Sequence, residues 1–411
     1  MKPLIYLYQE QLQEFLNKKT NIVGAAYEWK GEGVYHAYFD YPKVAPTGFP
    51  LVCLFSFGKK IIETIINDFV STNELQKKTN PIICIQFNIE NDGIITKQGV
   101  VFNGNEFIEA EINYVPTKSE LYTRSKGLLE VGVLEKKRVL IVGCGSGGSS
   151  IAVELAKAGV GNFVLVDFDR IELHNIARHI SGVNELGRLK TNAVKDAILL
   201  KNPYAKITTY DFDMQQHLNI IEQEVSQADL VIPATDNNRT RNQLNEYLQK
   251  YKKTGIFGRA NTRAEGGDVL RVRPEGPCYA CMKGSGWGEE LSDFKQARAV
   301  TPAYVSDEDV LANIQVGLST DIAPINTMIV KLALLELSRG TECEINSLDA
   351  ELTYDYYMWA NRRDNHFKKW FPFNNMPNNE KPAFLQKVPT ILQWYGVKYE
   401  KDLKCMVCSY G

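Results

Sequence analysis

A glycine-rich turn near the middle of the chain carries the clearest chemical signal. The turn is Gly143-Cys-Gly145-Ser146-Gly-Gly148, and Asp167 follows about 24 residues after its first glycine. Glycines let phosphate approach the main chain closely, and a helix that starts there directs N–H groups at the phosphates. A carboxylate at the distance of Asp167 can accept hydrogen bonds from ribose hydroxyls. The pattern predicts a nucleotide site; taken alone, the glycines also fit a tight strand–helix turn.

The residues around the turn predict the elements that position it. An apolar run at 139–142 is typical of a buried parallel strand, and Ile151, Leu155 and Ala158 recur on one face of a helix. A second strand is expected at 163–166. The fold class predicted is α/β, a Rossmann-like domain with a mostly parallel sheet, preceded by a smaller α+β domain.

Polar residues beyond the second strand suggest a triphosphate ligand. Asp169, Asn175 and Arg178 follow Asp167 closely, and Lys190 lies further on. Cations in this number suit the charge of ATP better than that of a dehydrogenase cofactor. Asp236 ends another predicted strand, where ligands of open α/β sheets bind. Its carboxylate suits Mg²⁺, although it could instead cap a helix predicted at 238–251.

These motifs, from about Leu121 to Cys281 and more loosely around Pro324 and the C-terminus, resemble the ThiF/MoeB/HesA family of adenylating enzymes. The resemblance implies an adenylyltransferase related to ubiquitin-activating enzymes. It would use ATP and Mg²⁺ to convert the C-terminal carboxylate of a ubiquitin-like or sulfur-carrier protein ending in glycine into acyl-AMP, with release of pyrophosphate. It also implies a homodimer.

The resemblance assigns roles to particular residues. Arg178 and Lys190 would oppose the developing charge, Asp236 would hold Mg²⁺, and Arg124 would reach the ATP of a partner subunit. The residues expected to bind the nucleotide are Gly143, Gly145, Ser146 (a glycine in the family), Gly148, Asp167, Asp169, Asn175 and Asn237.

Two other functions fit the same residues. One is adenylation of a ribosomal peptide, as in enzymes that mature microcin precursors. The other is a nucleotide-binding scaffold without chemistry, which is disfavoured because every charged position of the motif is present. The sequence does not identify the substrate.

Two Cys-x-x-Cys pairs predict a structural zinc site. Cys278 and Cys281 form one pair, and Cys405 and Cys408 form the other. Each short loop presents two thiolates on one side, and four thiolates complete a tetrahedral zinc site without an open position. The family resemblance supports zinc, which would tie the C-terminal segment to the adenylation domain.

The remaining cysteines argue against a thioester on this chain. Related ubiquitin-activating enzymes pass the acyl group to a cysteine in a crossover segment, expected here at 283–323, which contains none. Cys343 follows a helix predicted at 324–338 and sits between two glutamates that disfavour a thiolate. We therefore expect the acyl group of acyl-AMP to be transferred directly to a partner's thiol, a sulfur donor or an amine.

Composition and domain organisation complete the sequence-based picture. Residues 1–118 are expected to form the α+β domain, with recognition or scaffolding as its role, and 119–411 the adenylation domain. The net charge of −2 gives no basic excess for nucleic acid. No signal peptide or membrane span is evident, and eight cysteines without a secretory signal suggest reduced thiols and a cytoplasmic location.

Overall fold

The chain divides into two compact units in a computed structural model, Met1–Thr123 and Arg124–Gly411. The structure describes residues 2–28, 31–40, 50–73, 81–89, 95–115, 118–260, 264, 266–284, 317–361, 392–398 and 400–408. Within these ranges, the helices are too short or too polar to cross a membrane. The expected crossover segment lies mostly outside the described residues. The predicted cytoplasmic location stays a prediction.

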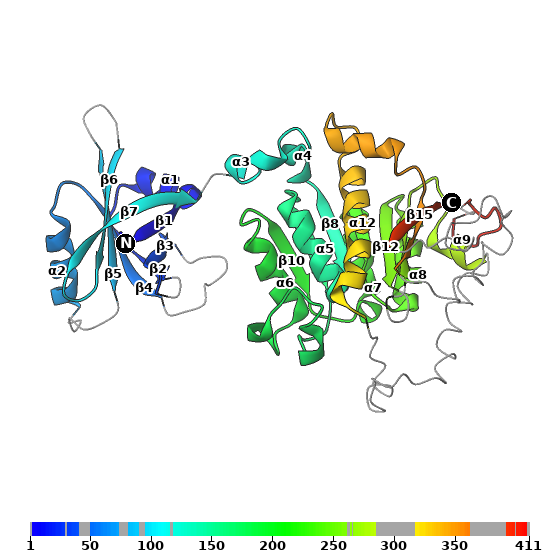
Figure 1. Ribbon diagram of the computed structural model, residues 1–411, viewed down its shortest axis with the longest axis horizontal. Helices are drawn as coiled ribbons and strands as arrows, with labels where there is room; N and C mark the ends of the chain where they lie inside the picture. Colours follow the sequence, from blue (N-terminus) through cyan, green and yellow to red (C-terminus); the bar gives the residue numbers. More distant parts are fainter. Residues whose placement is uncertain are drawn as a thin grey trace. The chain divides into compact units, whose positions relative to one another are not determined.

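The first unit is a closed barrel of seven strands with two main helices (Figure 1). The strand order is β1-β3-β2-β4-β5-β6-β7, and β7 pairs back with β1. Because β7 pairs back with β1, each described strand of the barrel has a partner on both sides, and there is no exposed sheet edge among them to protect. The elements are β1 (Leu4–Tyr8), α1 (Gln9–Lys18), β2 (Ile22–Glu28), β3 (Val34–Tyr38), β4 (Leu51–Phe57), α2 (Ile62–Thr72), β5 (Ile82–Ile89), β6 (Ile95–Phe102) and β7 (Phe107–Val115).

Side chains that alternate between the two faces of the strands form two hydrophobic cores in this unit. Cys53 and Phe55 of β4 face the barrel interior, where Phe15 of α1 also packs. Leu54 of the same strand faces outward, against Ile66 of α2. Successive side chains of a strand point to opposite faces, so one apolar run serves both cores. The α+β character agrees with the sequence prediction, and the closed barrel is an addition to it.

The second unit is built on an eight-stranded sheet in the order β10-β9-β8-β11-β12-β13-β14-β15. The first five strands are mutually parallel, and the last three are antiparallel additions. The Rossmann-like, mostly parallel sheet is therefore confirmed. The strands are β8 (Arg138–Val142), β9 (Asn162–Val166), β10 (Lys206–Tyr210), β11 (Leu230–Pro233), β12 (Thr254–Ala260), β13 (Gly266–Val272), β14 (Tyr356–Ala360) and β15 (Gln393–Val397).

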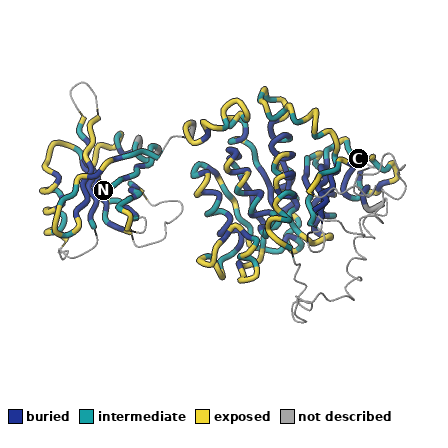
Figure 2. Tube along the Cα trace, in the orientation of Figure 1, coloured by how far each residue is buried: buried dark blue, intermediate teal, exposed yellow. Residues whose placement is uncertain are grey.

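Helices cover both faces of this sheet, and the strands between them are the most deeply buried part of the unit (Figure 2). On β8, Val139 and Ile141 face one layer, and Leu140 and Val142 face the other. The first layer contains α5 (Ser146–Lys157), α6 (Lys190–Leu199) and α12 (Ser319–Leu337); the second contains α7 (Leu218–Gln227), α8 (Asn238–Lys250) and α9 (Tyr279–Gly284).

Short elements complete the second unit. They are η1 (Thr123–Ser125, which crosses the boundary), α4 (Val131–Leu134), η2 (Leu173–Asn175), η3 (Val183–Glu185), η4 (Met214–Gln216) and η7 (Glu344–Ala350), while α3 (Lys118–Leu121) lies at the end of the first unit. The helix predicted to begin at Pro324 begins five residues earlier, at Ser319, with Pro324 in its second turn. As the sixth residue of the helix, Pro324 lies beyond the first N–H groups, so it removes the hydrogen bond that an N–H at this position would make to the Thr320 carbonyl.

Candidate active site and cysteine cluster

The glycine turn connects β8 to α5 at the point where the strand order reverses between β8 and β11. Gly143 has φ +99°, and a Cβ there would lie 2.6 Å from the carbonyl oxygen of Ala234, just beyond β11. A Cβ on Gly148 would lie 1.9 Å from the carbonyl oxygen of Gly143. Neither position accepts a side chain, because the main chain folds tightly against itself. The turn thereby aligns the start of α5 with the carboxyl edge of the parallel strands (Figure 1).

The start of α5 is open to a ligand. Gly145 is its N-cap residue and makes no side-chain capping bond, and a Cβ on it would meet no atom within 4 Å. The first N–H groups of a helix have no partner within the helix and carry the positive end of its dipole. Since no side chain of the described residues caps them, these groups are available to an anion. The geometry fits a phosphate group.

Asp167 closes the other side of the turn. Its carboxylate accepts hydrogen bonds from the backbone N–H of Cys144 at 2.6 Å and of Asp169 at 2.8 Å. Burial raises the pKa of Asp167, and the two N–H bonds partly offset that effect. A carboxylate offers about four acceptor positions. Asp167 can therefore hold the turn in shape and still accept from a ribose.

Lys190 and Asp169 form an ion pair beside this carboxylate. The Lys190 Nζ lies 2.7 Å from Asp169 Oδ2, and the Lys190 backbone N–H donates to the Asp169 carbonyl at 2.9 Å. Lys190 is only 8% exposed, although Asp169 is exposed. An ammonium group has three donors. The pair leaves capacity on Lys190 for a second anionic partner.

The segment that follows Asp169 is bound directly to the glycine turn. The Ser146 hydroxyl donates to the Arg178 carbonyl at 2.9 Å. His179 Nδ1 accepts from the Ser181 N–H, so its Nε2 carries the proton and donates to the Cys144 carbonyl at 2.8 Å. Burial lowers the pKa of His179, which favours this neutral form. His179 thus positions the turn.

Arg178 and Asn175 lie on the same segment. Both side chains are half-buried. The Asn175 Oδ1 accepts from the Glu172 N–H at 3.0 Å, which starts the short helix η2, and the Arg178 N–H donates to the Asn175 carbonyl. The structure therefore places the predicted arginine one turn after Asn175 and beside Ser146. The catalytic and binding roles of these two residues stay predictions.

Asp236 is exposed two residues beyond the contact between Gly143 and Ala234. The alternative in which Asp236 caps α8 is wrong, because the Asn237 Oδ1 accepts from the N–H groups of Arg239 at 2.9 Å and Thr240 at 3.3 Å. The side-chain oxygen of Asn237 is therefore occupied by hydrogen bonds within the protein. The exposed Asp236 carboxylate is a hard oxygen donor at this edge that could bind a cation.

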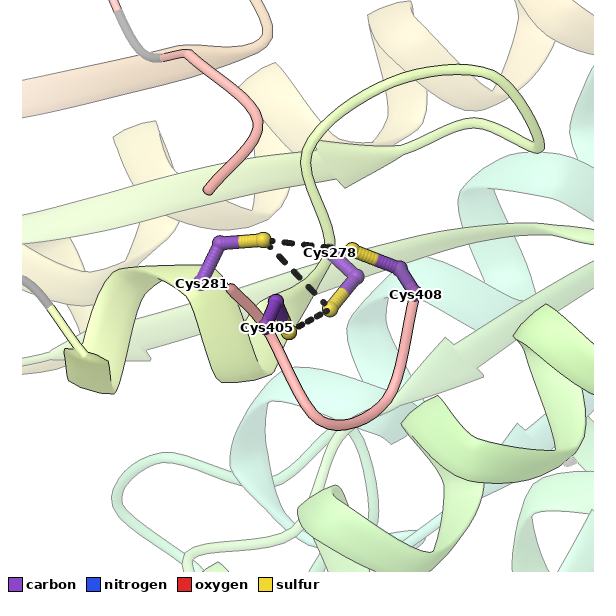
Figure 3. A group of neighbouring side chains, drawn as sticks. All are labelled: Cys278, Cys281, Cys405 and Cys408. Atoms are coloured by element: carbon purple, nitrogen blue, oxygen red, sulfur yellow. Dashed lines mark hydrogen bonds between the residues drawn. The ribbon is translucent and has the colours of Figure 1, made fainter. Parts of the chain in front are cut away.

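The two cysteine pairs come together although 124 residues separate them in the sequence, counted from Cys281 to Cys405. All four Sγ atoms lie within 4.8 Å of one another, and all four residues are buried (Figure 3). Measured contacts are 3.8 Å between Cys278 and Cys281, 3.7 Å between Cys278 and Cys405, and 3.3 Å between Cys281 and Cys408.

This cluster fits a tetrahedral metal ion. Zinc–sulfur bonds of about 2.3 Å put the sulfurs of a tetrahedral site about 3.8 Å apart. A hydrogen bond from Cys278 lowers the pKa of Cys281. That favours the thiolate, the form that binds metal. Antiparallel pairing of β15 with β14 is a second attachment of the C-terminal segment to the sheet.

Comparison with known proteins identifies the family. The ThiF family profile matches residues 123–358, which is more than half of the chain. The chain belongs to the ThiF family.

Individual relatives match part of the chain. The molybdopterin-synthase adenylyltransferase of Escherichia coli (strain K12) is 30% identical over 222 residues, 52% of this chain and 88% of that protein. The adenylyltransferase and sulfurtransferase MOCS3 of Culex quinquefasciatus is 32% identical over 169 residues, 39% of this chain and 37% of that protein. Among solved structures, E. coli MccB with ATP is similar at a TM-score of 0.45 and 15% identity, covering 68% of each chain.

One predicted residue of this ThiF-family chain lies away from the others. Arg124 is exposed on η1, and the carbonyls of Gly127 and Leu128 accept from the N–H groups of Glu344 and Ile345. Those residues follow the C-terminal end of α12, whereas the N-terminal half of α12 lies near the glycine turn. Within one chain, the structure does not bring Arg124 to the nucleotide site.

One polar residue near the turn was not predicted. Asn326 of α12 is 8% exposed, and a Cβ added to Gly147 would lie 3.4 Å from its Oδ1. It stands between Ile325 and Met328, which pack into the core. An asparagine on the apolar face of a helix is the signal that could have identified it, because buried amides need partners.

Proposed function

We propose that this ThiF-family protein adenylates the C-terminal carboxylate of a ubiquitin-like or sulfur-carrier protein. The single observation that carries the proposal is the convergence of the open α5 start, Asp167, the Lys190–Asp169 pair and Asp236 at the carboxyl edge of the sheet. The names of the relatives in E. coli and Culex quinquefasciatus support adenylyl transfer. The name of the E. coli relative, molybdopterin-synthase adenylyltransferase, gives a protein as what that enzyme adenylates, which supports a protein substrate over a short peptide.

The proposed reaction needs charge neutralisation more than acid–base chemistry. A carboxylate oxygen of the substrate attacks the α-phosphorus of ATP, and the bond from that phosphorus to the bridging oxygen breaks, releasing pyrophosphate. The carboxylate is ionised at neutral pH, so no general base is required. Lys190 and Arg178 would stabilise the charge that develops on phosphate oxygens. Asp167 and the N–H groups of α5 would hold the nucleotide in position.

Asp236 would hold Mg²⁺ in this proposal. It is exposed at the sheet edge, and its neighbour Asn237 is already occupied as the cap of α8. When bound, Mg²⁺ supplies neutralisation of phosphate charge and favours the leaving of pyrophosphate. An aspartate at this place needs few other protein ligands, because Mg²⁺ keeps several waters and binds phosphate oxygens.

The other parts of the proposal concern assembly. The four buried cysteines would hold one structural Zn²⁺, as their spacing supports. Two copies would form a homodimer in which Arg124 of each serves the partner subunit, which agrees with its distance from the site of its own chain. The barrel of residues 4–115 would recognise the substrate or act as a scaffold.

A pyrophosphate-exchange assay tests the proposed activity. Exchange of labelled pyrophosphate into ATP should require Mg²⁺ and a sulfur-carrier protein that ends in glycine. Asp236→Asn should lower the exchange rate about 100-fold or more, as expected when one interaction with transition-state charge is removed. Glu246→Gln, which changes an exposed carboxylate elsewhere on α8, is the matched control and should leave the rate unchanged.

Three outcomes would contradict the proposal in different ways. Failure of the wild type to bind ATP would refute the nucleotide site itself. Binding of ATP without exchange for any carrier protein, but with exchange for a short peptide, would replace the substrate class. An Asp236→Asn variant as active as Glu246→Gln would remove Asp236 from the metal site.

A further inference from the structure

A buried asparagine contacts the cysteine cluster from α8. Asn245 is 1% exposed and lies eight residues after Asn237, the cap of that helix. Its Nδ2 is 3.5 Å from Cys278 Sγ, and its Oδ1 accepts from the Tyr279 backbone N–H at 2.9 Å. One side-chain amide therefore bonds to two successive residues of the first Cys-x-x-Cys loop.

The orientation of this amide follows from its partners. The Tyr279 backbone N–H is only a donor, so the atom that faces it at 2.9 Å has to be the amide oxygen. The amide NH₂ group is then the atom that faces Cys278 Sγ. A donor in that place favours the sulfur as a thiolate, because the hydrogen bond spreads part of its negative charge.

We infer that Asn245 is a positioning residue for the zinc site, acting on the Cys278 ligand through its N–H···S hydrogen bond. The inference rests on the zinc site proposed above. Groups that hydrogen-bond to metal ligands orient those ligands and adjust how much charge they give to the metal. Here the same amide also holds the loop, since its oxygen binds the Tyr279 N–H. Asn245 thereby sets both the direction and the charge of one of the four sulfurs.

The alternative is that Asn245 only satisfies the buried Tyr279 N–H and has no effect on metal. A matched residue in the same unit separates the two roles. Asn202 is also 1% exposed, donates from Nδ2 to the Val160 carbonyl at 3.0 Å, and accepts at Oδ1 from the Tyr204 N–H at 3.2 Å. It has the same bonding pattern as Asn245, with a carbonyl in place of a sulfur.

The test compares Asn245→Asp with Asn202→Asp in the full chain loaded with zinc. Each change keeps the acceptor oxygen and removes the N–H donor. We expect zinc transfer to a chromogenic chelator to show a 10- to 100-fold weaker affinity for Asn245→Asp, and wild-type affinity for Asn202→Asp. With Co²⁺ as the metal, the sulfur-to-cobalt absorption band should shift in the Asn245 variant alone. If either aspartate variant does not fold, Asn245→Ala and Asn202→Ala are compared in the same way.

Two results would overturn the inference. Equal zinc affinity and equal cobalt spectra for the two variants would leave Asn245 with a purely structural role, while the zinc site itself stands. A wild-type protein that holds no zinc would remove the zinc site and the inference together. Neither readout depends on ATP, so failure of the proposed adenylation would not affect the comparison.

Discussion

Substitutions at two glycines of the turn, Gly148 and Gly145, are expected to change thermal stability and ATP affinity in different ways. Gly148→Ala would put a Cβ 1.9 Å from the Gly143 carbonyl oxygen, whereas ordinary contact begins near 3.4 Å. The main chain therefore has to move by the difference, about 1.5 Å. Gly145 has open space at its Cβ and starts α5 without a capping side chain.

The magnitudes follow from those two environments. Overpacking a tight site of this kind costs about 1–3 kcal/mol, and a unit of this size loses roughly 2 °C or slightly more per kcal/mol. A shift above 1 Å in the turn, where we propose that phosphate binds, should also lower activity about 100-fold. Gly145→Ser supplies a side chain that can cap the helix, which raises stability by a few tenths of a kcal/mol at most. The same hydroxyl would accept hydrogen bonds from the first N–H groups of α5, which would otherwise be available to a phosphate.

Differential scanning calorimetry measures the change in Tm for each variant, and ATP titration measures the change in ATP affinity. Gly148→Ala should lower both Tm and ATP affinity. Gly145→Ser should keep or slightly raise Tm while ATP affinity falls at least about tenfold, since the cap competes for the anion site. Wild-type ATP affinity in Gly145→Ser would refute the assignment of the α5 start as the phosphate site. An unchanged Tm in Gly148→Ala would refute the packing argument.

Four further predictions concern the metal, the dimer, pH and the acyl acceptor. Metal analysis should find one zinc per chain, and Cys405→Ser should lose it with about 3 kcal/mol of stability, the contribution of a ligand at 100 times its dissociation constant; equal stability without metal would contradict this. Mixing Arg124→Ala with Asp236→Ala should restore about a quarter of the activity, because half the dimers are hybrids with one intact site; a monomer by light scattering would exclude it. Burial lowers the pKa of His179 in the folded protein. As pH falls below about 6.5, its imidazole is therefore protonated more readily in the unfolded chain than in the folded one. Stability should therefore drop from pH 7.5 to 5.5 by less in His179→Gln than in wild type, by urea unfolding; equal drops would argue against it. Finally, a non-reducing gel after incubation with ATP and a carrier protein should show no thioester, and an adduct lost in Cys343→Ala would overturn that expectation.

The position of Cys343 adds a structural reason for the last expectation. It lies beyond the C-terminal end of α12, and the next residue, Glu344, donates its N–H to the Gly127 carbonyl. From Asn326, near the glycine turn, to Leu337 the helix rises about 16 Å at 1.5 Å per residue. An acyl-AMP at the turn would be too far away for direct transfer to this thiol.

Local sequence was sufficient where the interactions are local. The unit from Arg138 to Val166 was predictable because the strand, turn and helix each depend on near neighbours, and because a Cβ on Gly148 would meet the Gly143 carbonyl of the same turn. The cysteine pairs were predictable for a similar reason, since a Cys-x-x-Cys loop places two sulfurs together by itself. We expected the two Cys-x-x-Cys loops to lie together because four thiolates complete a zinc site, and the structure confirms that they do.

Pairings between distant residues needed the tertiary structure. The Lys190–Asp169 ion pair, the His179 bond to the Cys144 carbonyl and the contact of Asn245 with Cys278 each join separate segments. No spacing rule predicts them, because side-chain partners depend on how elements pack and not on their order in the chain. The choice between Asp236 and Asn237 as the cap of α8 also depended on the backbone conformation at the start of that helix.

The sequence by itself determined the family, the glycine turn and the types of residue around it, because these reside in short runs whose conformation is set locally. The tertiary structure alone decided that the first unit closes into a barrel, that the C-terminal strand β15 pairs with β14, and which polar groups near the turn are already partnered. Strand pairing and ion pairing are long-range choices among many similar partners, and burial in a common core selects one of them.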